Sequence, residues 1–118
     1  MSKKPPTPAV FQILLALADG ELHGYAIMQA VSDDTKNMLS MGPGTLYGAL
    51  KRMVDAGLVE ECREHTDPGM NDERRIYYRI TGHGRRVAAT EAERMAVLVR
   101  SAREKALIGP AAPKATPT

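Results

Sequence analysis

Residues 42–57 carry both the start signal and the stop signal of one short helix. Pro43 fits the first helical position because the N–H that it lacks would have no partner there. Gly57 can adopt the left-handed conformation that ends many helices. Four apolar residues fall at helical spacing and predict a face turned toward a core: Leu46, Leu50, Met53 and Val54. The fold must therefore hold this helix with one side buried.

The other face of the same helix is small at its start and basic in its middle. It carries Thr45, Gly48, Lys51, Arg52 and Asp55, with Tyr47 at the border between the two faces. Such a face is typical of an ordinary amphipathic helix, and it also suits a helix that presents its N-terminal end to DNA. The segment alone favours the ordinary helix, so the neighbouring segments must decide.

Two short helices are predicted ahead of this segment. The first opens with the cap-and-proline pair Thr7 and Pro8 and runs to about Ala18. Its core face is expected to comprise Phe11, Leu14, Leu15 and Ala18, with added breadth from Ile13 and Leu17. The second helix is expected over residues 22–31, with His23 as a structural residue near its start. Three helices in this order, the third with a basic face, indicate a helix-turn-helix.

After Gly57 the apolar residues change from the helical period to the strand period, which predicts strands at residues 58–64 and 74–80. Between them, residues 66–69 have the turn sequence Thr-Asp-Pro-Gly. An isolated hairpin is only marginally stable, so this one must pack on the helices. The predicted fold is therefore mainly α with a small antiparallel β-hairpin, a winged helix-turn-helix.

A long final helix is predicted from the N-cap residue Thr81 to about Leu107. At about 1.5 Å per residue it is roughly 40 Å long, more than a body of this size can cover. Six residues repeat at alternating intervals of four and three, the spacing of a helix that packs on another helix: Ala88, Ala92, Met95, Val99, Ala102 and Ala106. The helix either lies back along its own domain or pairs with a second copy, and we expect a homodimer.

The 118 residues are enough for one small domain with flanking segments. We expect a disordered basic arm at 1–6, the winged helix-turn-helix at 7–80, the C-terminal dimerisation helix at 81–108 and a disordered tail at 109–118. The net charge of +2 permits DNA binding without arguing for it. No apolar run approaches the roughly 18 residues of a membrane span, and no signal peptide is recognisable, so we expect a cytoplasmic protein.

Cys62 is the single cysteine, which excludes an intrachain disulfide and fits a reducing compartment. We expect a small buried or half-buried residue there rather than a reactive thiol. The histidines at 23, 65 and 83 are far apart and match no metal-ligand spacing with it. No metal or other cofactor is indicated. An enzyme has little support, because no Ser/His/Asp group, phosphate-binding loop or pair of buried carboxylates is evident.

Four short motifs occur in order along the chain. They are Leu-His-Gly-Tyr at 22–25, Gly-Thr-Leu-Tyr at 44–47 with Ala-Leu at 49–50, Gly-Leu-Val at 57–59, and Arg-Ile-Tyr-Tyr-Arg-Ile-Thr at 75–81 with Gly-Arg at 84–85. Each motif alone is loose, but together at this spacing they are specific. Over about residues 10–105 the chain resembles the PadR-like family of bacterial transcriptional regulators, in its short form with a single C-terminal helix.

This resemblance implies a dimer that binds a partly palindromic operator, usually as a repressor, with a recognition helix and a wing at each half-site. Thr45 and Tyr47 belong to the implied recognition helix and Lys51 lies near the DNA backbone, although Tyr47 is almost equally well explained as a core residue at the helix edge. We expect contacts from basic side chains to the phosphates to position the protein on the duplex, while Thr45 and its helix neighbours approach base edges. The residues expected to contact DNA are Lys36, Ser40, Gly44, Thr45, Tyr47, Lys51, Arg74, Arg75 and Tyr77.

The resemblance also implies an effector that releases the DNA, here an apolar small molecule. Five residues are candidates to line its site at the dimer junction, although core packing is the simpler explanation of them: Phe11, Met28, Met95, Leu98 and Val99. An alternative function is a winged helix that docks on another protein through its last helix and has little affinity for DNA. Salt-sensitive binding to the DNA upstream of its gene separates these two functions.

Overall fold

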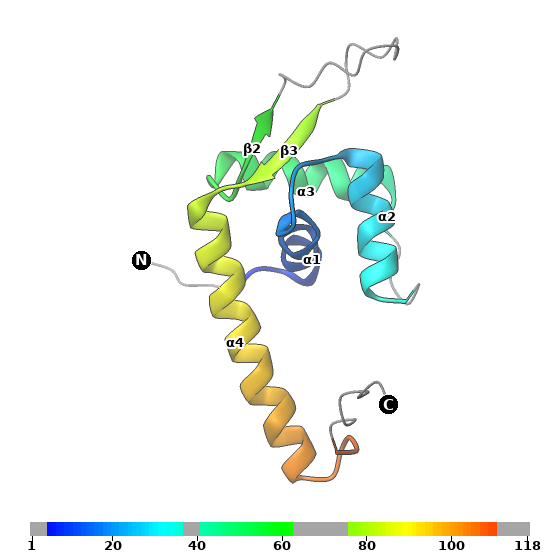
Figure 1. The fold of residues 1–118 in the computed structure, drawn as a ribbon, viewed down its shortest axis with the longest axis vertical. Helices are drawn as coiled ribbons and strands as arrows, with labels where there is room; N and C mark the ends of the chain where they lie inside the picture. Colours follow the sequence, from blue (N-terminus) through cyan, green and yellow to red (C-terminus); the bar gives the residue numbers. More distant parts are fainter. Residues whose placement is uncertain (1–4, 37–40, 63–75, 111–118) are drawn as a thin grey trace, which may run out of the picture.

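A computed structural model describes residues 5–36, 41–62 and 76–110 of the chain. Figure 1 shows α1 in the middle of the body, α2 and α3 beside it, a small sheet over α3, and α4 leaving the body as a long rod. This is the expected winged helix-turn-helix with a long last helix. The elements are α1 (Pro8–Leu17), β1 (Leu22–His23), α2 (Gly24–Asp34), α3 (Pro43–Asp55), β2 (Val59–Cys62), β3 (Tyr77–Ile80) and α4 (Gly82–Glu104).

The core forms where α1, α2 and α3 meet beneath the sheet. Its fully buried side chains include Ile13, Leu14, Leu17, Ile27, Val31, Leu46, Leu50, Met53 and Val59. The predicted core face of α1 is partly wrong, because Leu15 is 46% exposed while Ala16 is buried. Nearly every residue of α1 is apolar, so the sequence pattern could not select the buried side.

The second helix begins two residues later than predicted. Leu22 and His23 form the short strand β1, which pairs antiparallel with β3 through Leu22 with Tyr78 and His23 with Tyr77. The predicted hairpin is therefore part of a three-stranded sheet in the order β1-β3-β2. His23 is structural, as expected, because its Nδ1 accepts a hydrogen bond from the Ala26 amide at 3.3 Å and caps α2.

Strands β2 and β3 confirm the predicted change from helix to strand after Gly57, and burial alternates along β3 but not along β2. Val59 pairs with Ile80 and Cys62 with Tyr77, and the side chains of Val59, Tyr78 and Ile80 are buried against the helices. Cys62 is buried, as expected for a structural residue. The predicted turn at 66–69 lies outside the residues that the structure describes.

Helix α4 begins as predicted and ends earlier. The Thr81 side chain accepts a hydrogen bond from the Gly84 amide at 2.9 Å, which caps the first turn. At the other end the amides of Ala106 and Leu107 donate to the carbonyls of Arg103 and Ala102, and Ala106 has a φ of 61°. This Schellman arrangement ends α4 before Ala106, so the predicted extension to Leu107 is wrong. No helix in the described ranges is long and apolar enough to cross a membrane.

Candidate nucleic-acid interface

One face of α3 is exposed along the length of the helix. The opposite face is buried in the core through Leu46, Ala49, Leu50 and Met53. Because these buried side chains fix the rotation of the helix about its axis, the polar face is held toward solvent. Four of the residues expected to contact DNA lie together on it: Gly44, Thr45, Tyr47 and Lys51.

The N-terminus of α3 is open to an anion. Its N-cap residue is Gly42, which has no side chain to accept a hydrogen bond from the first turn. The first internal bond of the helix runs from the Leu46 amide to the Gly42 carbonyl at 3.0 Å. The preceding amides, on Gly44 and Thr45, therefore lie at the positive end of the helix dipole, where a phosphate oxygen can accept from them.

Tyr47 lies at the contact between two of the sequence motifs. A Cβ atom on residue 24 would come 2.1 Å from the Tyr47 hydroxyl oxygen and 2.7 Å from its Cζ atom, so the ring lies directly on Gly24. The side chain is nevertheless 48% exposed. Tyr47 thus packs against the start of α2 and also borders the exposed face of α3.

The other expected DNA contacts lie on different elements. Lys36 is exposed just beyond α2, with a φ of 52°. Tyr77 on β3 is half-buried, and its ring meets that of His23 edge to face with centroids 5.4 Å apart. Ser40, Arg74 and Arg75 lie outside the described residues. Helix α3 therefore gathers four of the nine expected contacts, and Lys36 and Tyr77 lie on other elements.

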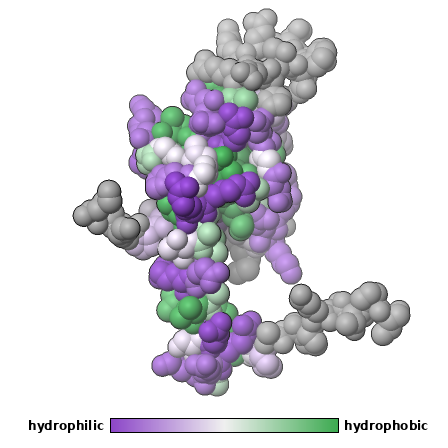
Figure 2. Space-filling view, turned by 60° about the vertical axis from the view of Figure 1, so that its left-hand side comes forward, coloured by the Kyte–Doolittle hydropathy of each residue, from purple (hydrophilic) through white to green (hydrophobic). Residues whose placement is uncertain are grey.

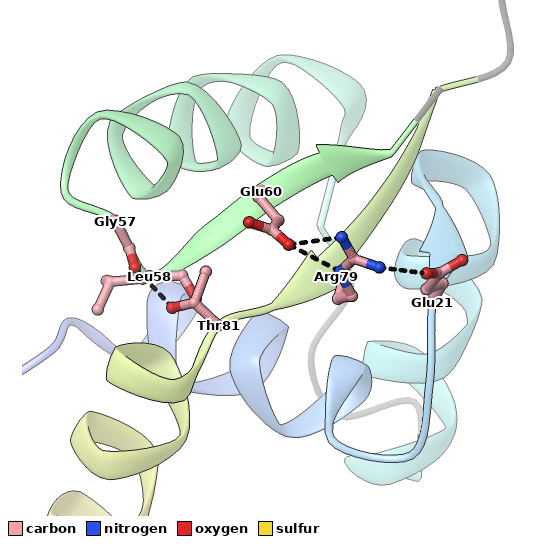
Figure 3. A network of polar contacts seen from close by, with 6 residues as sticks. All are labelled: Glu21, Gly57, Leu58, Glu60, Arg79 and Thr81. Atoms are coloured by element: carbon pink, nitrogen blue, oxygen red, sulfur yellow. Dashed lines mark hydrogen bonds and ion pairs between the residues drawn. The ribbon is translucent and has the colours of Figure 1, made fainter. Parts of the chain in front are cut away.

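An ion-pair network crosses the exposed side of the sheet (Figure 3). Arg79 on β3 donates to the Glu60 carboxylate on β2 at 2.8 Å and to the Glu21 carboxylate at 3.2 Å. The hydrogen bond to Glu60 raises the pKa of Arg79 above its ordinary value. Sequence reasoning missed this network, because the pairing of Glu60 with Arg79 depends on a strand register that the sequence does not reveal.

The expected dimerisation residues divide into two groups along α4. Ala88 and Met95 are half-buried where α4 runs along the body, and Ala88 packs against the core. Beyond them α4 projects from the body, and Val97, Leu98 and Val99 are 57%, 53% and 40% exposed. Figure 2 shows hydrophobic residues gathered on this projecting part of the rod. Ala92 is exposed, Ala102 is half-buried, and Ala106 lies past the end of the helix.

Glu91 is buried on the part of α4 that runs along the body. Its side chain is only 4% exposed, although it is not one of the six residues predicted to pack on another helix. Both carboxylate oxygens accept from the Arg94 guanidinium, at 2.8 and 2.6 Å. This bidentate hydrogen bond lowers the pKa of Glu91 below its ordinary value despite the opposing effect of desolvation.

The five expected effector residues are spread over α1, α2 and α4. A hollow of about 590 Å³ lies at the C-terminal end of α4, lined by residues 103–104 and 106–110, and none of the five residues lines it. Phe11, Met28 and Met95 are half-buried, and Leu98 and Val99 are exposed. Within the described ranges, no three His, Cys, Asp or Glu side chains are placed to hold a metal ion.

The three-helix core, the sheet and the exposed α3 define a winged helix-turn-helix protein with an additional C-terminal helix. Residues 13–90 match the model of the transcriptional regulator PadR-like family. The chain belongs to this family of transcriptional regulators. The family membership confirms the prediction that the protein is not an enzyme.

The matched relatives span a wide range of lengths. An uncharacterized 37.1 kDa protein in transposon TN4556 of Streptomyces fradiae is 41% identical over 86 residues, which are 73% of this chain and 22% of that protein. The chain thus spans about a fifth of this curated relative. A PadR family transcription regulator from Clostridium difficile R20291 has a similar fold, with a TM-score of 0.69, 20% identity and coverage of 83% of this chain and 97% of that one.

Two further solved structures share the fold. Bacillus subtilis PadR in complex with operator DNA superposes with a TM-score of 0.56 at 17% identity, covering 92% of this chain and 52% of that one. Bordetella bronchiseptica BpsR, whose DNA binding is regulated by 6-hydroxynicotinic acid, has a TM-score of 0.65 at 20% identity, covering 87% of this chain and 69% of that one.

Proposed function

We propose that this chain is a sequence-specific DNA-binding transcriptional regulator that acts as a homodimeric repressor. The observation that carries the proposal is α3, a helix whose apolar face is fully occupied by its own core while Gly44, Thr45, Tyr47 and Lys51 face solvent. Apart from Tyr47, whose ring also packs on Gly24, these exposed residues are not needed to bury apolar surface. They are therefore free to serve an external ligand.

The chemistry of this face suits a DNA duplex. The open amides at the start of α3 can donate to a phosphate, and Lys51 supplies a cation two turns further along. Thr45 combines a hydroxyl and a methyl group, which suit base edges in the major groove. The structure of Bacillus subtilis PadR, which has a similar fold and contains operator DNA, supports DNA as the ligand here.

The homodimer is proposed from α4. Val97, Leu98 and Val99 expose apolar surface on a part of the helix that its own body does not cover. A second copy of the same helix would bury this surface, since α4 also carries the small residues Ala92 and Ala102. Two recognition helices about 34 Å apart would then meet successive turns of one duplex, which predicts a two-part operator.

An apolar small molecule is proposed as the releasing effector. The regulation of BpsR by 6-hydroxynicotinic acid supports an effector within this fold. In this chain the effector site requires the dimer, because Leu98 and Val99 are exposed in a single copy. A thermal-shift screen with apolar compounds tests this part of the proposal, and the absence of any stabilising compound would count against it.

The DNA-binding proposal is tested by fluorescence anisotropy with the duplex upstream of the gene, over a series of salt concentrations. We expect Lys51→Ala to weaken binding to every sequence and to reduce the salt slope by about one per chain. Lys105→Ala is the matched control, because it removes the same charge at the far end of α4 and should leave the slope unchanged.

Two outcomes would contradict the proposal. An unchanged salt slope in Lys51→Ala would show that Lys51 does not contact the DNA phosphates. Failure of the native protein to bind upstream DNA or DNA selected from the genome, even at low salt, would reject DNA binding and favour a module that docks on another protein through α4.

A further inference from the structure

The base of α4 is attached directly to the turn that ends α3 (Figure 3). The Thr81 hydroxyl donates to the Gly57 carbonyl at 2.6 Å, and the Leu58 carbonyl oxygen lies 3.0 Å away. The Thr81 amide donates to the Leu58 carbonyl at 3.1 Å. The same hydroxyl oxygen accepts from the Gly84 amide at 2.9 Å. One side chain therefore holds the end of α3 and the first turn of α4 together.

Gly84 allows this attachment to be close. A Cβ atom on residue 84 would lie 2.1 Å from the Leu58 carbonyl oxygen and 3.0 Å from Cγ1 of Ile80. Backbone thus packs on backbone, with no flexible side chain between the two helices. Such a contact resists tilting, because any inward movement of α4 is blocked by the Leu58 carbonyl group.

A second attachment lies on the other side of the same turn of α4. The Arg85 guanidinium donates to the Ala18 carbonyl, the C-cap of α1, at 2.8 Å. The base of α4 is therefore fixed at two places, the end of α3 and the end of α1. We call Thr81, Gly84 and Arg85, with the carbonyl groups that they contact, the α4 joint.

The α4 joint stands at the base of a long lever. The 23 residues of α4 extend about 34 Å at about 1.5 Å per residue. A tilt of about 10° at its base moves the far end by about 6 Å, whereas neighbouring base pairs are about 3.4 Å apart. In a symmetric dimer held through the projecting half of α4, such a tilt changes the separation of the two α3 helices by more than one base-pair step.

We propose that the α4 joint determines which half-site spacing the protein accepts, with Thr81 and Gly84 as its positioning residues. The proposal rests on the proposed function as a DNA-binding homodimer, and it assigns these residues a role in specificity although they do not lie on the exposed face of α3. Loosening the joint should leave each half-site contact intact and weaken the preference for one separation.

The test compares Thr81→Val with Thr81→Ser in the full-length protein. Valine keeps the shape of threonine and removes the hydroxyl, whereas serine keeps the hydroxyl. The probes are duplexes carrying two half-sites that the native protein has selected from random DNA, with the spacer lengthened or shortened by one or two base pairs. We expect the native protein and Thr81→Ser to prefer one spacer by about tenfold, and Thr81→Val to discriminate by less than about threefold.

Arg85→Met provides an independent variant, because Arg85 is exposed and its loss does not open the core. It should also flatten the spacer preference. Arg86→Met is the matched control, since it removes the same charge one residue away and should keep the preference. Dimer mass by sedimentation and affinity for a single half-site are measured for every variant, and a merely structural role would change these values instead of the spacer profile.

The outcomes separate this proposal from the proposed function. If the native protein selects no DNA, DNA binding fails and the spacing role fails with it. If the native protein prefers one spacer and both Thr81→Val and Arg85→Met keep that preference, the spacing role is wrong while DNA binding stands. If Thr81→Val does not fold, an unchanged profile in Arg85→Met overturns the proposal and a flattened profile supports it.

Discussion

The two longest helices meet their need for burial in different ways. α3 buries Leu46, Leu50 and Met53 entirely in its own core and exposes a polar face. α4 is covered only along its first half, and beyond Met95 it exposes three successive apolar residues, 97–99. In α3, stability and proposed function therefore occupy opposite faces. In the projecting half of α4, the surface proposed for assembly is also the surface that needs burial.

The largest expected effect is on the buried face of α3. Leu50→Ala should lower the free energy of unfolding by about 2–5 kcal/mol, because it removes buried methyl groups and leaves a cavity. Lys51→Ala, the next residue on the exposed face, should change it by less than about 0.5 kcal/mol. Urea denaturation measures both values, and similar losses in the two variants would refute the separation of the faces.

A charge on the projecting half of α4 should act on assembly. Val99→Glu is expected to raise the dimer dissociation constant by about 100-fold, since the carboxylate would be buried in an apolar interface. The unfolding temperature of the native protein should rise with concentration, and that of the variant should not. Thr90→Glu adds the same charge off the exposed apolar patch and serves as the control. Sedimentation of the native protein as a monomer at micromolar concentration would contradict the proposed homodimer.

The C-terminal ends of α3 and α4 offer a paired test of backbone conformation. Both end in a left-handed residue, Gly57 with a φ of 76° and Ala106 with a φ of 61°. Because a side chain disfavours this conformation, Gly57→Ala should destabilise the fold by about 1–2 kcal/mol. Ala106→Gly should be neutral or stabilise it by up to about 1 kcal/mol. Thermal unfolding of both variants decides whether the two ends obey the same rule.

The smallest expected effect is the loss of stability at acidic pH through the ion pair between Glu91 and Arg94. Arg94 lowers the pKa of Glu91, so the stabilisation is complete above the ordinary pKa of a glutamate and is lost as the pH falls through the lowered value. The native protein should therefore lose more stability than Glu91→Gln on acidification from neutral pH to below pH 4, near the ordinary pKa of about 4.3. If the unfolding temperatures of the native protein and Glu91→Gln fall by the same amount across this pH range, the ion pair does not stabilise the fold.

The parts of the fold that were predicted correctly have strong local signals. Pro43 and Gly57 bound α3, and Thr81 starts α4, because each of these residues has a backbone or capping property that few others share. The exposed face of α3 followed from the same helix periodicity. The four residues assembled there, 44, 45, 47 and 51, lie on one face as the pattern indicated, and their contacts with DNA remain predictions.

The parts that sequence could not provide depend on tertiary position. A strand of two residues, β1, has too few positions to show a period. The burial of Glu91 depends on where α4 meets the body, and a charged residue normally indicates a solvated face. The Arg79 network depends on register, and the attachment of Thr81 to Gly57 joins residues 24 positions apart. None of these contacts leaves a local pattern in the chain.

The contact between Gly24 and the Tyr47 ring has a genetic consequence. A residue larger than glycine at position 24 collides with the ring, so its first effect should be to displace Tyr47 from α2 and disturb the exposed face of α3. A smaller residue at position 47 would then relieve this collision. In a library randomised at both codons and selected for stably folded protein, the two positions should vary together: tyrosine should survive with glycine, and bulk at position 24 should survive only where the ring has been lost.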